Sequence, residues 1–143
     1  MVSRKKHVLF VCFGNACRSI MAEAIAKADA WDVIEPISAG LYPLGVVPAH
    51  TRETLEQNGY SAVGLASKSI ARSSWERADV IINLSGRMRE LEFDVYEKVE
   101  DWVVGDPYGE DAKTYQRIFL DIQGRVRNLA RRLREQQQEA ASR

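Results

Sequence analysis

The sequence has only two cysteines, no net charge and no long apolar run. Lys and Arg together number 20, as do Asp and Glu, so the charge balance gives no indication of nucleic acid or an anionic membrane as a partner. No apolar stretch approaches the ~18 residues of a membrane span. The short apolar segment 8–12 leads straight into Gly14-Asn15, which is not typical of a signal peptide.

The two cysteines, Cys12 and Cys17, lie too close together in the chain to staple a fold. A zinc site takes about four ligands, and beyond these thiols the chain offers only two distant histidines. We therefore expect no metal and no cofactor. Unpaired cysteines are typical of a reducing compartment, which predicts a cytoplasmic protein. The 143 residues suit one domain over 1–143 with a single core, and we expect a monomer.

Hydrophobic periodicity divides the chain into alternating strands and helices. Short apolar runs predict strands over 7–11, 33–38, 78–84 and 99–104. Helical spacing and capping signals predict helices from Arg18, over 48–59, 70–77 and 86–93, and along the apolar stripe from Tyr115 to Leu133. The polar tail 135–143 is expected to fray.

This alternation predicts an α/β fold, in which a single three-layer domain has a central sheet of four mainly parallel strands and helices on both faces. Ligands of such domains bind beyond the carboxyl ends of the strands. Two segments follow such ends, the loop 12–19 and the turn Gly105-Asp106-Pro107. We expect the functional site where these two segments meet.

The segment from Cys12 to Ser19 reads Cys-Phe-Gly-Asn-Ala-Cys-Arg-Ser and joins a strand to a helix. A tight loop that opens a helix points several backbone N–H groups inward, which makes an anion-binding nest. Gly14 and Asn15 are the residue types that best tolerate left-handed backbone angles. The planar guanidinium of Arg18 matches phosphate oxygens. The pattern therefore predicts a phosphate-binding loop.

Cys12 is the predicted nucleophile of this loop. A helix N-terminus beside a cation favours the thiolate over the thiol, so Cys12 needs no histidine as a base, and Ser19 is placed to donate a hydrogen bond to the thiolate. An inert core cysteine at a strand end is the alternative. The residues expected to bind phosphate are those of the loop itself: Phe13, Gly14, Asn15, Ala16, Cys17, Arg18 and Ser19.

These residues resemble the signature of the low-molecular-weight protein tyrosine phosphatase family, a strand followed by Cys-x-Gly-Asn-x-Cys-Arg-Ser. The family's distant acid lies in an Asp-Pro-Tyr turn before the last helix, which this sequence matches at Asp106-Pro107-Tyr108. The segment Ser38-Ala39-Gly40 resembles the family's serine-containing turn after the second strand. The likeness covers nearly the whole chain. It implies a phosphotyrosine protein as substrate, and a cognate tyrosine kinase as a possible partner.

The resemblance implies a two-step mechanism. Cys12 attacks phosphorus and forms a phosphocysteine, while Arg18 binds the phosphate and Asp106 protonates the leaving phenolate. The same Asp106 then activates the water that releases phosphate. For its first role Asp106 has to be protonated in the complex with substrate. A plain turn with no chemical role is the alternative for this residue.

The family likeness also implies that Asn15, Ser19 and Ser38 support the shape of the loop by hydrogen bonds. Cys17 is hypothesised to form a disulfide with Cys12 on oxidation, which would protect the nucleophile from irreversible steps. A small buried residue with no redox role is the alternative for Cys17.

The sequence departs from the family pattern at three places. Ile20 replaces the usual proline after the loop, and the segment 66–69 lacks a bracing histidine, for which Ser67 is a partial substitute. The loop 41–45 lacks the tryptophan that often forms a pocket wall. The aromatic contact is therefore expected from Tyr108, with Phe13 or Tyr42, and the three tryptophans are expected in the core or at its boundary: Trp31, Trp75 and Trp102.

Three other functions compete with the phosphatase. Arsenate reductases share this loop, but the thioredoxin-coupled form needs further cysteines near the strand 78–84, and this chain has none after Cys17. A non-catalytic phosphate-binding module would lack the nucleophile or the acid. A dinucleotide-binding domain is disfavoured because no Gly-x-Gly-x-x-Gly occurs.

Overall fold

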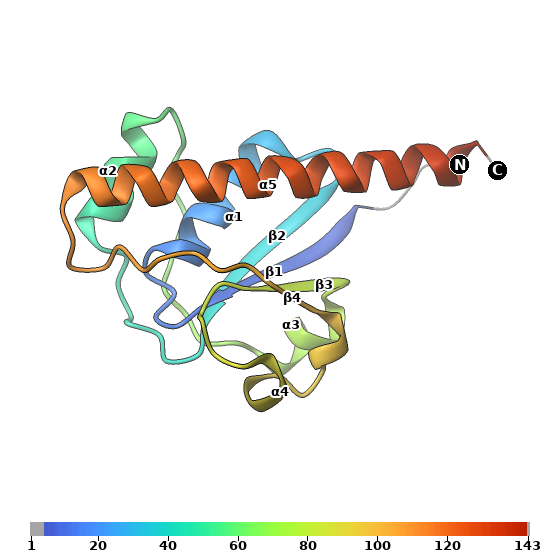
Figure 1. Cartoon of the computed structure of the whole chain (residues 1–143), viewed down its shortest axis with the longest axis horizontal. Coiled ribbons are helices and arrows are strands. Elements are labelled where there is room, and N and C mark those ends of the chain that lie inside the picture. The colour runs from blue at the N-terminus through green and yellow to red at the C-terminus, as the bar shows by residue number, and fades with distance from the viewer. Residues whose placement is uncertain (1–4, 143) are drawn as a thin grey trace.

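The computed structural model describes residues 5–142, and of residues 72–74 only the backbone path. Its elements in chain order are β1 (Lys6–Cys12), α1 (Arg18–Asp29), β2 (Ile34–Gly40), α2 (Ala49–Gln57), α3 (Arg72–Arg77), β3 (Val80–Asn83), α4 (Arg89–Glu92), the 3-10 helix η1 (Tyr96–Lys98), β4 (Val99–Asp101) and α5 (Ala112–Ala141) (Figure 1). Among the helices described, none is both long and apolar enough to cross a membrane.

The sheet has four parallel strands in the order β2-β1-β3-β4. Cys12 at the end of β1 pairs with Gly40 at the end of β2, and Val11 pairs with Asn83 at the end of β3. The carboxyl ends of these strands therefore meet at one edge of the sheet. The predicted α/β class and parallel sheet are confirmed.

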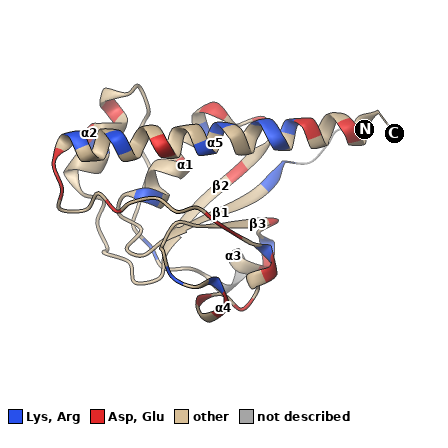
Figure 2. Ribbon diagram, in the orientation of Figure 1, with Lys and Arg blue, Asp and Glu red and all other residues tan. Residues whose placement is uncertain are grey.

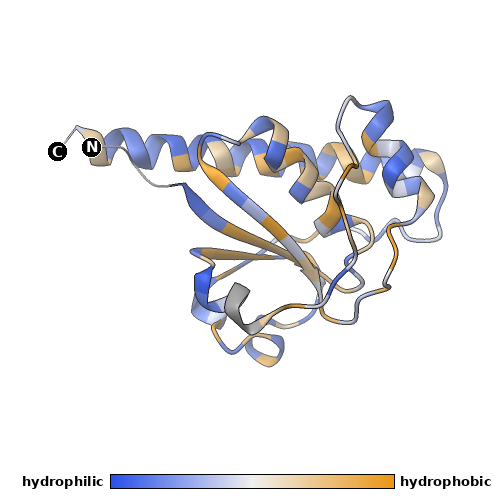
Figure 3. Ribbon diagram, turned by 180° about the vertical axis from the view of Figure 1, so that it is seen from behind, coloured by the Kyte–Doolittle hydropathy of each residue, from blue (hydrophilic) through white to orange (hydrophobic). Residues whose placement is uncertain are grey.

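Helices cover both faces of this sheet, as predicted. Helices α1 and α5 lie on one face, with α2 packed against them, while α3 and α4 lie on the other (Figure 1). Each face of the sheet has its own apolar core. Along β1, Val8 and Phe10 belong to the core under α1 and α5, whereas Leu9 and Val11 belong to the core on the opposite face. All four side chains have no exposed surface. The central strands β1 and β3 are apolar over most of their length, whereas β2 mixes apolar and polar residues (Figure 3); apolar central strands are expected where both faces of a parallel sheet are covered.

Helix α5 presents one apolar stripe to this core. Asp111 caps its start, because its side chain accepts a hydrogen bond from the N–H of Thr114 at 2.9 Å. The charged residues along the rest of its surface are mostly basic, with acidic residues at Asp121, Glu135 and Glu139 (Figure 2). The buried stripe contains every residue predicted for it: Tyr115, Ile118, Phe119, Ile122, Val126, Leu129 and Leu133.

The prediction of a frayed tail over 135–143 is wrong for residues 135–141, because α5 continues to Ala141; residue 143 lies outside the described residues. Arg134 anchors this end, since its guanidinium lies 2.8 Å from the carboxylate of Asp32 and donates to the carbonyl of Asp29 at 2.9 Å. Once a helix is anchored, each added residue costs little, and the tail consists mostly of good helix formers.

Several predicted elements are shorter in the structure, and two of them have half the predicted length. The helix predicted over 86–93 is a single turn, Arg89–Glu92, because the side chain of Asn83 donates to the carbonyl of Arg87 at 2.9 Å and holds a tight turn there. Gly86 supports that turn with a φ of 79°. The strand predicted over 99–104 ends at Asp101.

The tryptophans occupy three different environments. Trp102 is buried and Trp75 half-buried, as expected. The prediction is wrong for Trp31, which is 64% exposed. It lies in the turn between α1 and β2, where the ammonium of Lys5 lies 5.8 Å from the centre of its ring. An aromatic residue in a surface turn has no core to enter, and the cation is its main contact.

We predict that the stability of the fold requires a glycine at position 40, because β2 ends in close contact with the loop that follows Cys12. A Cβ atom added at Gly40 would lie 2.8 Å from the backbone nitrogen of Asn15 and 2.9 Å from the carbonyl carbon of Gly14. We predict that Gly40→Ala lowers the free energy of unfolding by about 1–3 kcal/mol, measured by urea denaturation, because backbone would have to move.

Gly124 in α5 provides the matched control, because a Cβ there would meet nothing within 4 Å. Gly124→Ala should raise the free energy of unfolding by about 0.5–1 kcal/mol. A Gly40→Ala protein as stable as the wild type would contradict the close approach of β2 to the loop.

Candidate active site

The loop between β1 and α1 is fastened along its outer side. Asn15 turns the chain with a φ of 46°, the one positive φ of a residue other than glycine within residues 5–142. The segment after β2 runs beside the loop and extends the pairing of the strands. Its N–H groups donate to three loop carbonyls: Leu41 to Cys12 at 3.1 Å, Tyr42 to Phe13 at 2.8 Å and Leu44 to Gly14 at 2.8 Å.

The loop lines a pocket of about 240 Å³ at the carboxyl edge of the sheet. The pocket brings together the β1–α1 loop, the segment after β2 and the turn before α5, as the sequence predicted. Asn15 and Ser19 do not line it but lie fully buried behind the loop. Its lining residues are Cys12, Phe13, Gly14, Ala16, Cys17, Arg18, Tyr42, Leu44, Asp106 and Tyr108.

Cys12 connects this pocket to a buried row of polar side chains. Its Sγ lies 2.9 Å from the hydroxyl oxygen of Ser19. The amide nitrogen of Asn15 donates to that same oxygen at 2.7 Å and to the hydroxyl of Ser38 at 3.1 Å. The hydrogen bonds expected among Asn15, Ser19 and Ser38 are therefore present, and they join the loop to β2.

The segment 66–69 braces the loop without a histidine. The hydroxyl of Ser67 donates to the carbonyl of Gly14 at 3.0 Å and accepts from the N–H of Gly45 at 2.9 Å. The N–H of Lys68 donates to the amide oxygen of Asn15 at 2.8 Å. Ser67 thus makes hydrogen bonds that brace the loop, consistent with its predicted role as a partial substitute for the missing histidine. Ile20, at the position of the usual proline, is fully buried in the core.

Arg18 is held at the pocket by backbone carbonyls. Its Nη1 donates to the carbonyl of Leu84 at 2.5 Å and to that of Val104 at 3.4 Å. Its Nε is buried and has no hydrogen-bond partner among the described residues. A buried donor without a partner is costly, so the site favours an oxyanion that would accept from Arg18.

Asp106 lies across the mouth of the pocket from the loop. Its Oδ2 is 3.5 Å from Nη2 of Arg18, and its Oδ1 accepts from the N–H of Tyr108 at 3.1 Å. The side chain of Asp106 is 53% exposed, so it can exchange protons with water. The two segments that the sequence placed at strand ends therefore meet through these two charged groups.

The back of the loop rests on α2 and α5. The hydroxyl of Thr51 donates to the carbonyl of Ala16 at 2.8 Å, and the hydroxyl of Tyr115 lies 3.3 Å from Sγ of Cys17. Burial raises the pKa of the Cys17 thiol, and burial with the contact to Cys17 raises the pKa of Tyr115. Both groups are therefore neutral. Sequence reasoning missed Thr51, and it placed Tyr115 only in the core stripe.

Aromatic side chains form the rim of the pocket. The rings of Phe13 and Tyr42 lie 5.1 Å apart, and the guanidinium of Arg87 lies 6.0 Å from the centre of the Phe13 ring. Tyr108 lines the same pocket and is 54% exposed. All three aromatic residues expected at the pocket are brought together there, although no tryptophan is among its lining residues.

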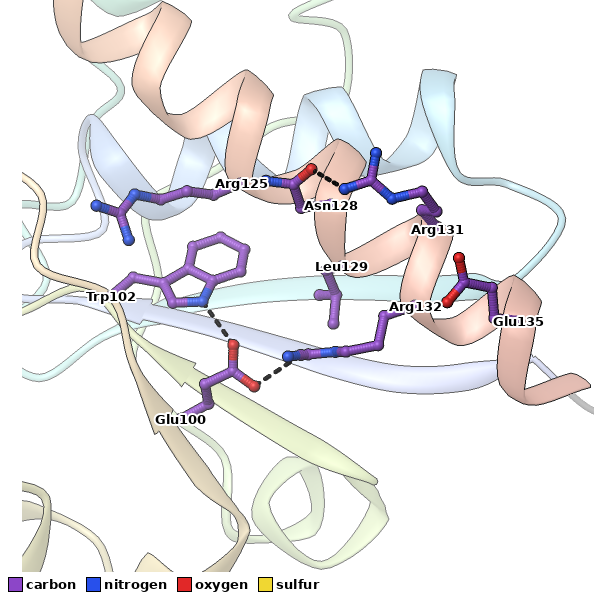
Figure 4. Close-up of a pocket in the computed structure, with 8 residues that line it drawn as sticks. All are labelled: Glu100, Trp102, Arg125, Asn128, Leu129, Arg131, Arg132 and Glu135. Carbon is purple, nitrogen blue, oxygen red and sulfur yellow. Dashed lines mark hydrogen bonds and ion pairs between the residues drawn. The ribbon is translucent and has the colours of Figure 1, made fainter.

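A second pocket, of about 440 Å³, lies between α5 and the end of the sheet (Figure 4). Two of its charged groups pair with each other, since Arg132 lies 2.7 Å from Glu100, which also accepts from the indole N–H of Trp102 at 2.8 Å. Arg131 donates to the side chain of Asn128 at 2.6 Å. No cysteine lines this pocket, so the smaller pocket at Cys12 is the candidate active site.

The fold and the loop together define a class of small α/β proteins that bind an oxyanion over a cysteine at the first strand–helix turn. Comparison with known families agrees. The chain belongs to the low molecular weight phosphotyrosine protein phosphatase family, whose model matches residues 7–139.

Individual relatives include more than one activity. A glutaredoxin arsenate reductase of Synechocystis is 34% identical, over 87% of this chain and 95% of its own length. A low molecular weight protein tyrosine phosphatase of T. tengcongensis is 26% identical, with a TM-score of 0.80 over 90% of this chain and 100% of that one. The YwlE arginine phosphatase of Geobacillus stearothermophilus shares the fold, with a TM-score of 0.85 and 23% identity over 94% of this chain and 96% of its own.

Inorganic phosphate is predicted to stabilise the protein through Arg18. At 100 times its dissociation constant, a ligand that binds only the folded state adds about 2.7 kcal/mol to the free energy of unfolding, which would appear as a rise in melting temperature. Arg18→Lys should abolish this rise, because an ammonium cannot reach two carbonyls and an oxyanion together. Arg131→Lys in the second pocket should keep it. A phosphate-dependent rise retained in Arg18→Lys would contradict this assignment.

Proposed function

We propose that this protein is a protein tyrosine phosphatase, which hydrolyses aryl phosphate monoesters through a phosphocysteine intermediate. Cys12 is the nucleophile, Arg18 binds the phosphate, and Asp106 is the general acid and base. No cofactor takes part. The observation that carries the proposal is the meeting of these three side chains in one pocket, although Asp106 comes from a turn more than 80 residues away in the sequence.

In the first step, the thiolate of Cys12 attacks phosphorus. An S–P bond forms as the bond to the leaving phenolic oxygen breaks, and Asp106 gives its proton to that oxygen. The guanidinium of Arg18 neutralises charge on the phosphoryl oxygens throughout, as a preorganised donor does. Its two carbonyl anchors hold it there before substrate arrives.

In the second step, a water molecule attacks the phosphocysteine. Asp106, now ionised, takes a proton from the water, the S–P bond breaks, and inorganic phosphate leaves with the Cys12 thiolate restored. One carboxyl group can serve both steps because its side chain is partly exposed at the mouth of the pocket, 3.5 Å from Arg18. The remaining loop residues support the phosphate and the shape of the loop.

The rim of the pocket favours an aromatic substrate. Phe13, Tyr42 and Tyr108 can pack on a phenyl ring, and they stand in for the tryptophan that the loop 41–45 lacks. We therefore propose phosphotyrosine in proteins as the substrate, supplied by a tyrosine kinase. We propose that the protein acts in the cytoplasm as a monomer.

Hydrolysis of p-nitrophenyl phosphate tests the mechanism. We predict that the wild type hydrolyses it, that Cys12→Ser is inactive, and that Asp106→Ala loses about 10²–10⁴-fold in kcat, the usual contribution of a general acid. Asp121→Ala is the control, because Asp121 is a carboxylate on α5 that pairs with Arg125. Activity that survives Cys12→Ser would refute the mechanism. A wild type that binds phosphate but hydrolyses nothing would indicate a binding module.

Arsenate reduction is the second candidate, favoured by the name of the Synechocystis relative. It requires two thiols, because one attacks arsenic and a second must then attack that sulfur, so that a disulfide forms and arsenite leaves with two electrons. The chain has only two cysteines. The second, Cys17, is buried against Tyr115, and burial raises its pKa. A neutral thiol is a poor nucleophile, so the second thiol would have to come from a donor such as glutathione, whereas the chain itself supplies every group of the phosphatase mechanism, which places the phosphatase first.

The two candidates differ in what arsenate does to the protein. As a phosphatase, the wild type should show no arsenate-dependent oxidation of glutathione or of thioredoxin, and arsenate should inhibit p-nitrophenyl phosphate hydrolysis competitively by occupying the site of phosphate. Continuous thiol oxidation that depends on arsenate and on Cys12 would instead establish the reductase.

A further inference from the structure

Glu23 is a buried carboxylate that the proposed mechanism does not use. It lies on α1 with its side chain 7% exposed, one turn beyond the loop. Lys27 lies 2.8 Å from its Oε2, and Lys68 lies 3.8 Å from its Oε1. A buried charge is expensive unless it is paired and hydrogen-bonded. The two lysine ammonium groups compensate the negative charge of Glu23, and a hydroxyl group donates a hydrogen bond to the same carboxylate.

That hydroxyl belongs to Ser38 on β2, which donates to Oε1 of Glu23. An ionised carboxylate can only accept hydrogen bonds, and a hydroxyl has one proton to donate. Ser38 therefore donates its only hydroxyl proton to Glu23. Toward its other neighbour, Asn15, the oxygen of Ser38 can only accept.

The amide of Asn15 is oriented from two sides. Its oxygen accepts from the N–H of Lys68 at 2.8 Å, which leaves its nitrogen facing Ser38 and Ser19, at 3.1 Å and 2.7 Å. The amide nitrogen has two protons and accepts none, so one goes to each serine. The acceptor role of Ser38 and the N–H of Lys68 thus select the same orientation of Asn15.

Ser19 is the last member of this chain of hydrogen bonds. Its oxygen accepts from Asn15, and its own proton remains for Sγ of Cys12 at 2.9 Å. In the opposite direction, Ser19 would accept from both the thiol and Asn15, and its buried proton would have no acceptor in this row of side chains. Asn15, Ser19 and Ser38 are fully buried, and low local polarity strengthens such a chain.

We propose that Glu23 is a positioning residue for the nucleophile: it sets the direction of the hydrogen-bond chain through Ser38, Asn15 and Ser19, so that Ser19 presents its proton to the thiolate of Cys12. The inference rests on the proposed role of Cys12. It assigns to a carboxylate outside the pocket a control over the pH at which Cys12 becomes reactive. Sequence reasoning missed Glu23, because its position on α1 alone does not reveal its contact with β2.

Other charged and titratable groups also face the two ends of this chain. Arg18, Asp106 and Cys17 line the pocket with Cys12, and the hydroxyl of Tyr115 contacts Cys17. Lys27 and Lys68 face Glu23. Loss of the negative charge of Glu23 would by itself favour the Cys12 thiolate and move its titration down, so an upward movement reports on the hydrogen-bond chain.

The test is the pH dependence of Cys12 alkylation by iodoacetamide, with the labelled cysteine identified by mass spectrometry. In Glu23→Gln the neutral amide can itself donate to Ser38, so Ser38 no longer has to accept from Asn15, only the N–H of Lys68 still orients the Asn15 amide, and the chain is weakened. We expect the midpoint of the alkylation profile to move up by about one pH unit, which is about a tenfold loss of thiolate below the midpoint. The acid limb of kcat/KM should move with it.

Glu100 supplies the control, because like Glu23 it accepts from a neutral donor, here Trp102, and forms an ion pair, here with Arg132 (Figure 4). Glu100→Gln should leave the alkylation midpoint of Cys12 unchanged. If Glu23→Gln does not fold, judged by circular dichroism, Ser38→Ala interrupts the same chain one step later and should move the midpoint in the same direction.

A double substitution separates this role from general destabilisation. In Ser19→Ala the last donor is missing, so adding Glu23→Gln should not move the midpoint further. An unmoved midpoint in Glu23→Gln, or a shift of equal size in the Ser19→Ala background, would overturn the proposal. Because alkylation needs no turnover, a protein that lacks phosphatase activity but shows the expected shift would refute the proposed function alone.

Discussion

The active-site loop depends on the buried side chain of Asn15. Its positive φ turns the chain between β1 and α1, and both polar atoms of its side-chain amide have hydrogen-bond partners. The oxygen accepts from Lys68, and the nitrogen donates to Ser19 and Ser38. Three segments that are distant in sequence therefore fix one side chain, and a loop without regular structure gains one conformation. The absence of a Cβ at Gly40 allows β2 to approach this close.

The parallel sheet supplies the rest of the site by geometry. Its strands end at one edge, so the carbonyls of Leu84 and Val104 meet the guanidinium of Arg18, and the following turn places Asp106 3.5 Å from it. Cys17 lines the same pocket, and burial raises the pKa of its thiol. The pocket thus holds the proposed nucleophile Cys12 with Asp106 opposite, beside a second thiol that is poorly suited to a redox cycle. This difference between the two thiols is consistent with the proposal of phosphoryl transfer.

Sequence reasoning succeeded where a residue's effect is local. The apolar stripe of α5, the buried strands and the loop were predicted because periodicity and turn-forming residues act within a few positions. It failed for the tail 135–141, where the ion pair between Arg134 and Asp32 continues the helix. It also failed for 86–93, where Asn83, which donates to Asp101 on β4, also donates to the carbonyl of Arg87 and delays the start of the helix. Trp31 was misplaced because hydropathy does not say whether a core lies nearby.

The sequence by itself determined which chemical groups the site contains: a cysteine, an arginine and an aspartate, at the ends of strands and beside residues that permit a tight turn. Only the tertiary structure decided how those groups are held. The anchors of Arg18 are backbone carbonyls, which every residue has and no residue type reveals. Likewise, the direction of the hydrogen bonds that reach Cys12 depends on the contact of Glu23 with β2, because a hydroxyl donates or accepts according to its neighbours in space.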